Sequence, residues 1–245
     1  MKAVFAFAAT LALLPGAALA GPQLGVGKFN DYLDAGKSTY TKRIYNSGTT
    51  AAFVKVRAWE LVAQADGTYQ EVPLDDAAAG GQRDLVVSPA RLIIPANGMQ
   101  TVRFVFNGER AHERLFRLRF NPVMPEGRSD FALTAEEAQT YAQSLRAGVQ
   151  VMAGYGTLLY VSPKNARHEI AIEQGAAGFS VRNTGNATAV LDLLQRCDAG
   201  GSCAEPGAAI VRPGHTKHFE KHSAEVYHFK HQQGDGQARR YEIKG

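Results

Sequence analysis

The chain has 245 residues, with 27 Lys and Arg against 23 Asp and Glu, which gives a formal net charge of +4. This small basic excess is far from the dense positive surface of a nucleic-acid-binding protein, so no nucleic-acid partner is expected. The length favours two domains of ordinary size, although one large β domain is the alternative.

Residues 1–20 have the pattern of a secretory signal peptide. Lys2 is followed by the apolar run Ala3–Leu14 and by small residues at Ala18 and Ala20, where cleavage is expected. The apolar run is shorter than the roughly 20 residues of a membrane-spanning helix. The sequence therefore predicts an exported protein that begins near Gly21.

Short runs rich in β-branched and aromatic residues follow, separated by Gly, Pro, Asn or Asp. Helical periodicity is almost absent, so the runs predict an all-β protein built of antiparallel sandwiches. The expected strands cover residues 40–45, 51–62, 85–94, 99–106, 115–120, 149–161, 169–173, 179–182 and 188–194.

One segment, residues 134–146, departs from this pattern. Thr134 followed three residues later by Glu137 matches the capping box that begins a helix. The apolar positions of the segment are mostly alanine. We therefore expect a connection between two strands here rather than a core helix.

A faint internal repeat divides the chain. Residues 46–56 align without gaps with residues 183–193, and each copy begins with Asn and turns through Gly. Each copy is followed by an apolar strand, a Pro and a Gly, at 92–98 and 209–214. Two copies of one sandwich predict domains of residues 21–162 and 163–245, with Pro163 ending the last strand of the first.

The two cysteines, Cys197 and Cys203, flank a turn at Gly200-Gly201. In an exported protein this spacing predicts a structural disulfide. A redox-active pair is the alternative. It is disfavoured because the spacing is not Cys-x-x-Cys and no helix start follows to lower a thiol pKa.

Three segments together resemble the periplasmic pilus chaperones of the chaperone-usher pathway. Residues 88–104 are similar to the family's proline, apolar strand, turn glycine and Val-Arg. Residues 113–122 resemble its Glu before an aromatic strand that ends with Pro, and Leu158–Tyr160 with Pro163 resembles the close of its first domain. The resemblance implies two immunoglobulin-like β-sandwich domains in tandem with a cleft between them, and no enzymatic activity or cofactor.

The same resemblance implies a location in the periplasm, pilin subunits and an outer-membrane usher as partners, and a free protein that could cap itself by dimerising. It also implies that the last strand of the first domain is lent to a pilin. Backbone hydrogen bonds and alternate apolar side chains would complete the pilin fold. The alternating positions are Val149, Val151, Ala153 and Tyr155.

Two alternatives apply to this donor strand. It could simply fill its own core, and a bulge at Gly154 or Gly156 would switch the face that it exposes and bring Met152 into play.

The family anchors the terminal carboxylate of the subunit with two basic residues. Lys28 is similar to the first of them, but the second position falls near Thr157, which carries no charge. This departure leaves Arg91, Arg117 and Arg119 as the nearest candidate bases. The alternative for each arginine is a solvated strand face.

A metal site was weighed because five histidines crowd the C-terminal region. Imidazoles at close spacing can bind zinc or copper. On a strand, however, His215 and His218 would point to opposite faces, and no Cys or carboxylate completes a ligand set. An exported immunoglobulin-like metal carrier is therefore the alternative function, with stoichiometric metal as its test. The histidines are His215, His218, His222, His228 and His231.

Overall fold

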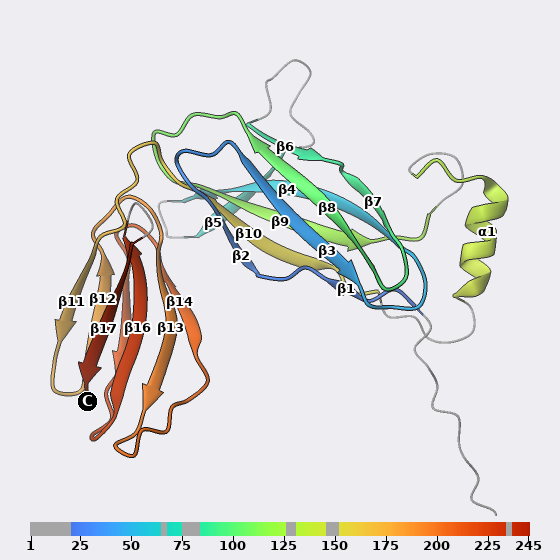
Figure 1. The fold of residues 1–245 in the computed structure, drawn as a ribbon. Coiled ribbons are helices and arrows are strands. Elements are labelled where there is room, and N and C mark those ends of the chain that lie inside the picture. The colour runs from blue at the N-terminus through green and yellow to red at the C-terminus, as the bar shows by residue number, and fades with distance from the viewer. Residues whose placement is uncertain (1–20, 65–67, 75–83, 126–130, 146–151, 234–236) are drawn as a thin grey trace, which may run out of the picture.

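The strands form two β-sandwiches that meet at an angle (Figure 1). The computed structural model describes residues 21–64, 68–74, 84–125, 131–145, 152–233 and 237–245. Within these ranges no helix is long and apolar enough to cross a membrane. The all-β prediction of two immunoglobulin-like sandwiches is confirmed.

The first sandwich consists of two sheets, called A and B here. All of their strand pairs are antiparallel except the β2–β10 pair, which is parallel. Sheet A has the order β1 (Leu24–Gly25), β3 (Thr39–Asn46), β8 (Gly98–Phe106), β6 (Leu85–Ser88). Sheet B has the order β2 (Asn30–Leu33), β10 (Tyr155–Val161), β9 (Arg114–Pro122), β4 (Ala52–Ala63), β5 (Tyr69–Pro73), and β7 (Arg91–Ile94) also pairs with β4.

The second sandwich consists of sheets C and D, and every pair is antiparallel. Sheet C has the order β11 (Ile170–Gln174), β12 (Gly178–Asn183), β15 (Thr216–Glu220). Sheet D has the order β14 (Gly207–Val211), β13 (Ala189–Cys197), β16 (Val226–Gln233), β17 (Gln237–Lys244).

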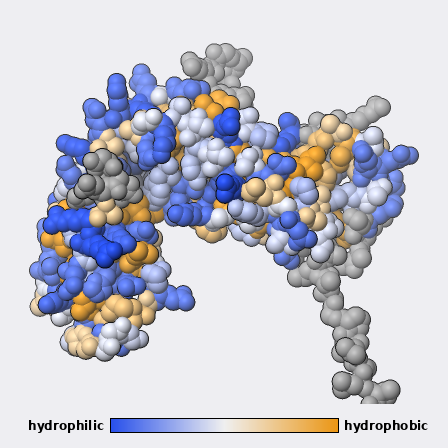
Figure 2. Space-filling view, viewed as in Figure 1, coloured by the Kyte–Doolittle hydropathy of each residue, from blue (hydrophilic) through white to orange (hydrophobic). Residues whose placement is uncertain are grey.

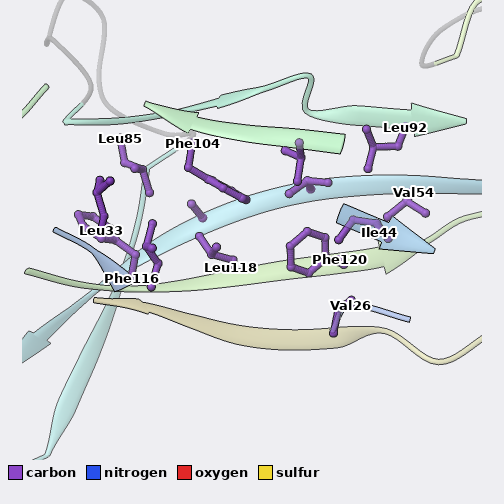
Figure 3. Close-up of a cluster of buried hydrophobic side chains, with 14 of the residues drawn as sticks. Val26, Leu33, Ile44, Val54, Leu85, Leu92, Phe104, Phe116, Leu118 and Phe120 are labelled. Carbon is purple, nitrogen blue, oxygen red and sulfur yellow. The ribbon is translucent and has the colours of Figure 1, made fainter. Parts of the chain in front are cut away.

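Alternate residues of the strands fill the core of the first sandwich (Figure 3). Phe116, Leu118 and Phe120 on β9 have no exposed surface, while the residues between them point out of the sandwich. Phe104 of sheet A meets Phe120 of sheet B edge to face, with ring centroids 6.5 Å apart. Each buried aromatic side chain contributes about 1.5–3 kcal/mol, so this layer holds the two sheets together.

The sequence repeat corresponds to one local structure that occurs in both sandwiches. The buried Asn46 side chain accepts a hydrogen bond from the Gly48 N–H at 3.0 Å and donates to the Thr50 and Ile94 carbonyls. The buried Asn183 does the same with Gly185, Ala187 and Val211. In each copy the amide ties a turn to a distant strand.

The glycine in each turn allows a close backbone approach. A Cβ on Gly185 would lie 1.9 Å from the Arg167 carbonyl oxygen, and one on Gly48 would lie 2.0 Å from the Gly21 carbonyl oxygen. We expect Gly185→Ala to lower the free energy of unfolding by about 1–3 kcal/mol, because overpacking forces the backbone apart. Urea unfolding checks this, with Gly175→Ala as control because its Cβ would meet nothing closer than 3.6 Å. Equal stability of the two variants would contradict the role of the turn.

The expected strand over residues 85–94 is wrong in one respect, because it is two strands in different sheets. β6 joins sheet A and β7 joins sheet B. Pro89 lies between them, and a proline has no N–H with which to continue a ladder. The chain changes sheets at this proline.

The capping box at residues 134–146 is confirmed, and helix α1 (Ala135–Ser144) forms an ordered connection between β9 and β10. Thr134 and Glu137 make both hydrogen bonds of the capping box. The Tyr141 ring lies 4.8 Å from the Phe53 ring, and its hydroxyl donates to the Ala51 carbonyl at 2.6 Å. Aromatic contacts at the edge of sheet B thus compensate for an alanine-rich helix.

Candidate functional site

The predicted donor strand is described from Met152 onward. Val149 and Val151 lie outside the described residues. Of the rest, Met152–Gly154 are not in a strand, Ala153 is exposed, and β10 begins at Tyr155. Tyr155 is half-buried and packs against the core of its own sandwich. The described strand is therefore shorter than the predicted run of residues 149–161.

The first part of β10 has a partner strand on one side only. β9 pairs with β10 along its whole length, from Tyr155 to Val161, whereas β2 pairs only with Leu158–Val161. The Leu158 N–H donates to the Phe29 carbonyl at 2.8 Å. In a strand, the backbone N–H and C=O groups of residues two apart point in the same direction. The backbone groups of Gly156 therefore point to the same side as those of Leu158, but beyond the end of β2. In the described chain, no strand pairs with this edge, which we call the open edge (residues 155–157).

The open edge arises because the N-terminal chain leaves sheet B. β2 pairs in sheet B, but β1 pairs with β3 in sheet A, so the chain crosses between the sheets at residues 26–29. Gly27 has a φ of 65°, a left-handed conformation that glycine adopts at no steric cost. This crossing ends the β2 ladder before it reaches Gly156.

A buried ion pair holds the crossing in place. The Lys42 ammonium of β3 donates to the Asp31 carboxylate of β2 at 2.6 Å and to the Lys28 carbonyl at 2.7 Å. The Tyr40 hydroxyl donates to the other Asp31 oxygen at 2.5 Å. The side chains of Lys42 and Asp31 are only 3% and 1% exposed. Burial, and then the bond to Asp31, raise the pKa of Tyr40.

Side chains alternate along β10 between the core and the outer face of sheet B. Thr157 and Leu159 point into the core, while Leu158 and Tyr160 join an outer apolar cluster. The Thr157 hydroxyl is buried and has no hydrogen-bond partner in the described structure. The position expected for a second anchoring base is therefore inside the sandwich.

Of the predicted bases, Lys28 lies at the open edge and Arg91 does not. Lys28 is exposed and precedes Phe29, which is 55% exposed and whose ring centroid lies 6.4 Å from that of Tyr155. Arg91 is exposed on β7, with β4 and β9 between it and β10. The role of both residues stays a prediction.

Two other arginines lie nearer to the open edge. Arg119 is directly opposite Gly156 and Arg117 is directly opposite Leu158, both on β9. The Glu71 carboxylate of β5 binds both guanidinium groups, one with each oxygen. The Arg119 guanidinium also lies over the Trp59 ring, 4.4 Å from its centroid. One carboxylate thus positions two guanidinium cations. Together, Arg117, Arg119 and Glu71 carry a net charge of one positive unit.

Among the described residues, the space directly beside Gly156 on this face is open. A Cβ built on Gly156 would meet no atom within 4 Å. Arg117 and Arg119 were candidates from the sequence alone, whereas Glu71 and Trp59 were not. The alternation of Arg117 and Arg119 on one strand was the available signal, since it places both on one face.

The two sandwiches are joined by polar and apolar contacts. The Glu113 carboxylate of the first accepts hydrogen bonds from the Thr188 N–H at 2.7 Å and the Thr188 hydroxyl at 2.6 Å in the second. Burial raises the pKa of Glu113, against the opposing effect of these bonds. Ile210 of the second sandwich packs against the cluster of Leu61, Leu115 and Tyr160 in the first. The junction leaves a concave side between the two lobes, visible in Figure 2.

The C-terminal cysteines and histidines have separate positions. The predicted disulfide between Cys197 and Cys203 is present. His231 is fully buried, with its ring nitrogens next to the Val190 and His168 carbonyls, whereas His218 is exposed on sheet C. Among the described residues, no three His, Cys, Asp or Glu side chains gather to hold a metal ion.

Comparisons with known proteins agree with this architecture. No family model matches the chain. "Probable fimbrial chaperone EcpB" of Klebsiella pneumoniae is 27% identical over 203 residues, which cover 81% of each chain. The protein of that name from Escherichia coli is 28% identical over 218 residues, which cover 86% of this chain and 87% of the relative.

Solved structures have the same fold. The class 5 fimbriae chaperone CfaA superposes with a TM-score of 0.52 and 18% identity, over 91% of this chain and 99% of CfaA. The Escherichia coli chaperone DraB gives a TM-score of 0.52 with 14% identity, over 91% and 97% of the two chains. A chain from the complex of Salmonella enterica SafA pilin with the SafB chaperone gives 0.51 with 15% identity, over 93% and 97%.

The curated relatives span nearly the whole chain, and the two sandwiches agree with the solved chaperones. These relatives are chaperones and not enzymes. The resemblance to the fimbrial chaperones of the chaperone-usher pathway is therefore confirmed, and the chain is similar to such chaperones over more than four fifths of its length.

Proposed function

We propose that this protein binds fimbrial subunits in the periplasm by lending them the open edge of β10, and delivers them to an outer-membrane usher. A subunit that lacks one strand exposes an apolar groove and unsatisfied backbone groups, which would otherwise aggregate. A lent strand supplies backbone hydrogen bonds and apolar side chains to such a groove.

One observation carries the proposal: the backbone of Gly156 points past the end of β2, while β9 holds β10 from the other side. The strand is therefore anchored in its own protein and still has hydrogen-bonding capacity to offer. Phe29 adds an exposed aromatic side chain beside this edge. The predicted contributions of Val149, Val151 and Ala153 belong to the same proposal, whereas Tyr155 packs against its own core.

The bases near the open edge fit a carboxylate of the subunit. Lys28 lies on the β2 side of β10, and Arg119 lies on the β9 side, directly opposite Gly156. Guanidinium groups bind carboxylates with two parallel hydrogen bonds, and Arg119 is already positioned by Glu71 and Trp59. Arg119 is a better candidate than Arg91 for the second base that the sequence lacks at Thr157.

The domain limits and the targeting of the chain are part of the same proposal. Residues 1–20 would be removed as a signal peptide, and the domains would be residues 21–162 and 163–245. Strands β10 and β11, on either side of this limit, belong to different sandwiches, which supports it. A second copy of the chain could cover the open edge of the free protein, because an unpaired edge is a template for strand pairing.

Co-purification tests the proposed function. A C-terminally tagged chain is expressed with the fimbrial genes that neighbour its own, and proteins recovered from the periplasm are identified by mass spectrometry. We expect a fimbrial subunit in stoichiometric amount. Recovery of the chain without any subunit, or with bound copper or zinc instead, would contradict the proposal.

Lys28→Ala tests the first base. The variant should reduce recovery of the co-expressed subunit about 10-fold, because a charge-assisted hydrogen bond contributes about 1.5–3 kcal/mol. Its melting temperature should stay unchanged, because the Lys28 side chain is exposed. Lys217→Ala, at an exposed site on β15, is the matched control. A parallel fall of melting temperature and recovery would show that Lys28 is structural.

A further inference from the structure

Sheet D contains a strained, exposed leucine that the fold does not require. β13 shifts register against both of its neighbours between Asp192 and Gln195, so it contains a β-bulge there. Leu193 in this bulge has a φ of 51° and is 42% exposed. A left-handed conformation is costly for leucine, and bulges often re-aim a side chain at a functional site.

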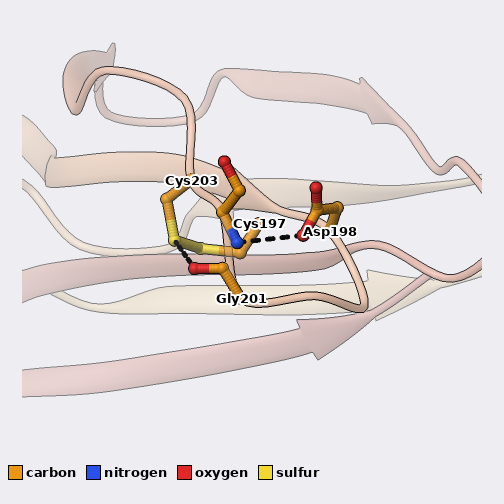
Figure 4. The surroundings of a disulfide bond; sticks show 5 residues. Cys197, Asp198, Gly201 and Cys203 are labelled. Atoms are coloured by element: carbon orange, nitrogen blue, oxygen red, sulfur yellow. Dashed lines mark hydrogen bonds between the residues drawn. A yellow bond between two sulfur atoms is a disulfide. The ribbon is translucent and has the colours of Figure 1, made fainter.

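Leu193 borders a hollow of about 380 Å³ on the outer face of sheet D. Phe229 and Tyr241 also border it, but their rings pack in the core of the second sandwich. The disulfide of Cys197 and Cys203 forms part of its wall, and hydrogen bonds within residues 198–202 hold this loop (Figure 4). The hollow therefore combines the exposed apolar side chain of Leu193 with a rigid border.

The charged residues of the hollow are all basic. Lys230 and Arg240 line it, next to the imidazole of His228, and no carboxylate does so among the described residues. Asp192 is opposite Lys230, and Glu242 is opposite His228.

Arg240, on the edge strand β17, is directly opposite Lys230. Like charges directly opposite each other destabilise a sheet. A carboxylate bound beside Arg240 would relieve this repulsion.

The hollow lies on the concave side of the molecule. Ile210 alternates with the core residues Ala209 and Val211, so it is on the outer face of sheet D, and it packs against Tyr160 of the first sandwich. Val190 is opposite Ile210, and Leu193 follows three residues later, about 10 Å further along the strand. In Figure 1, β13 and β14 lie on the side of the second sandwich that faces the concave space beside β2 and β10.

We propose that this hollow is a second contact site for the subunit held on the open edge, and that it takes a large apolar side chain with an adjacent carboxylate. This proposal rests on the proposed function. The subunit would lie along β10 and reach across the concave side, where Leu193 and the disulfide bind the apolar group and Arg240 binds the carboxylate.

Leu193→Gly separates this role from a structural one. Glycine relieves the strain at a φ of 51°, so the melting temperature should stay or rise. The complex with the co-expressed fimbrial subunit that the wild-type chain retains should dissociate about 10-fold faster, because an apolar contact is lost. Val86→Ala, at a 36% exposed apolar site on β6 of sheet A, should leave dissociation unchanged.

A charge reversal gives an independent measurement. Arg240→Glu should weaken the same complex about 10-fold, whereas Lys217→Glu on sheet C should not. The proposal is overturned if both variants, Arg240→Glu and Leu193→Gly, retain the subunit as the wild type does. It is also overturned if Arg240→Glu retains the subunit and the only effect of Leu193→Gly is a lower melting temperature. If the wild-type chain itself retains no subunit, the proposed function fails instead.

Discussion

Gly156→Pro is expected to abolish subunit binding while leaving the free protein folded. The Gly156 N–H points away from β9, so its loss removes no hydrogen bond of the described sheet. Proline is tolerated on an edge strand when its missing N–H faces solvent. An incoming strand would lose one hydrogen bond and meet the proline ring, so recovery of the co-expressed subunit should fall at least about 10-fold.

Gly156→Ala is the matched control for this variant. Its Cβ would meet no atom within 4 Å, and the backbone N–H is retained. Circular dichroism and the melting temperature should be the same for the wild type and both variants. Full recovery of the subunit by a folded Gly156→Pro protein would mean that the open edge is not the strand that is lent.

Lys42→Ala is expected to be the most destabilising single change at the site. It would leave the Asp31 carboxylate buried without its cation, which costs about 3–5 kcal/mol of unfolding free energy. It would also remove the hydrogen bond that pins the Lys28 carbonyl at the crossing between the sheets. Urea unfolding of the single variant measures the loss.

The double variant Lys42→Met with Asp31→Leu is the control for this prediction. Replacing a buried ion pair by apolar residues of similar size is often neutral or stabilising, so much of the stability should return. A Lys42→Ala protein less than about 1 kcal/mol below the wild type would mean that the pair is hydrated and does not hold β2 in place.

The regular part of the fold could be predicted because its signals are local. Alternation with a period of two located β9, where Phe116, Leu118 and Phe120 fill the core. The repeat beginning at Asn46 and Asn183 predicted two similar sandwiches, because the same side-chain hydrogen bonds close both turns.

The open edge could not be predicted, because it depends on pairings between distant residues. β2 joins β10 about 130 residues later along the chain, and the crossing at Gly27 decides where that pairing stops. Tyr155 was expected to face a partner. Its pairing opposite Phe120, a core residue, turns it toward its own sandwich instead.

The grouping of the candidate bases could not be predicted either, because it also depends on pairings between distant strands. In the sequence, Arg117 and Arg119 are two charged residues on a predicted strand, which is common on a solvated face. They become a site because Glu71 on β5 reaches both of them and β10 passes beside them with a glycine. Only the register of four strands brings these groups together.

Hydrogen exchange at the Gly156 amide tests the central claim most directly. In the free protein this N–H should exchange rapidly, because it points away from both neighbouring strands. In the complex with the co-expressed subunit, strand pairing should slow it strongly, while exposed amides of sheet C keep their rates. An equally fast Gly156 amide in a stable complex would contradict strand lending by β10.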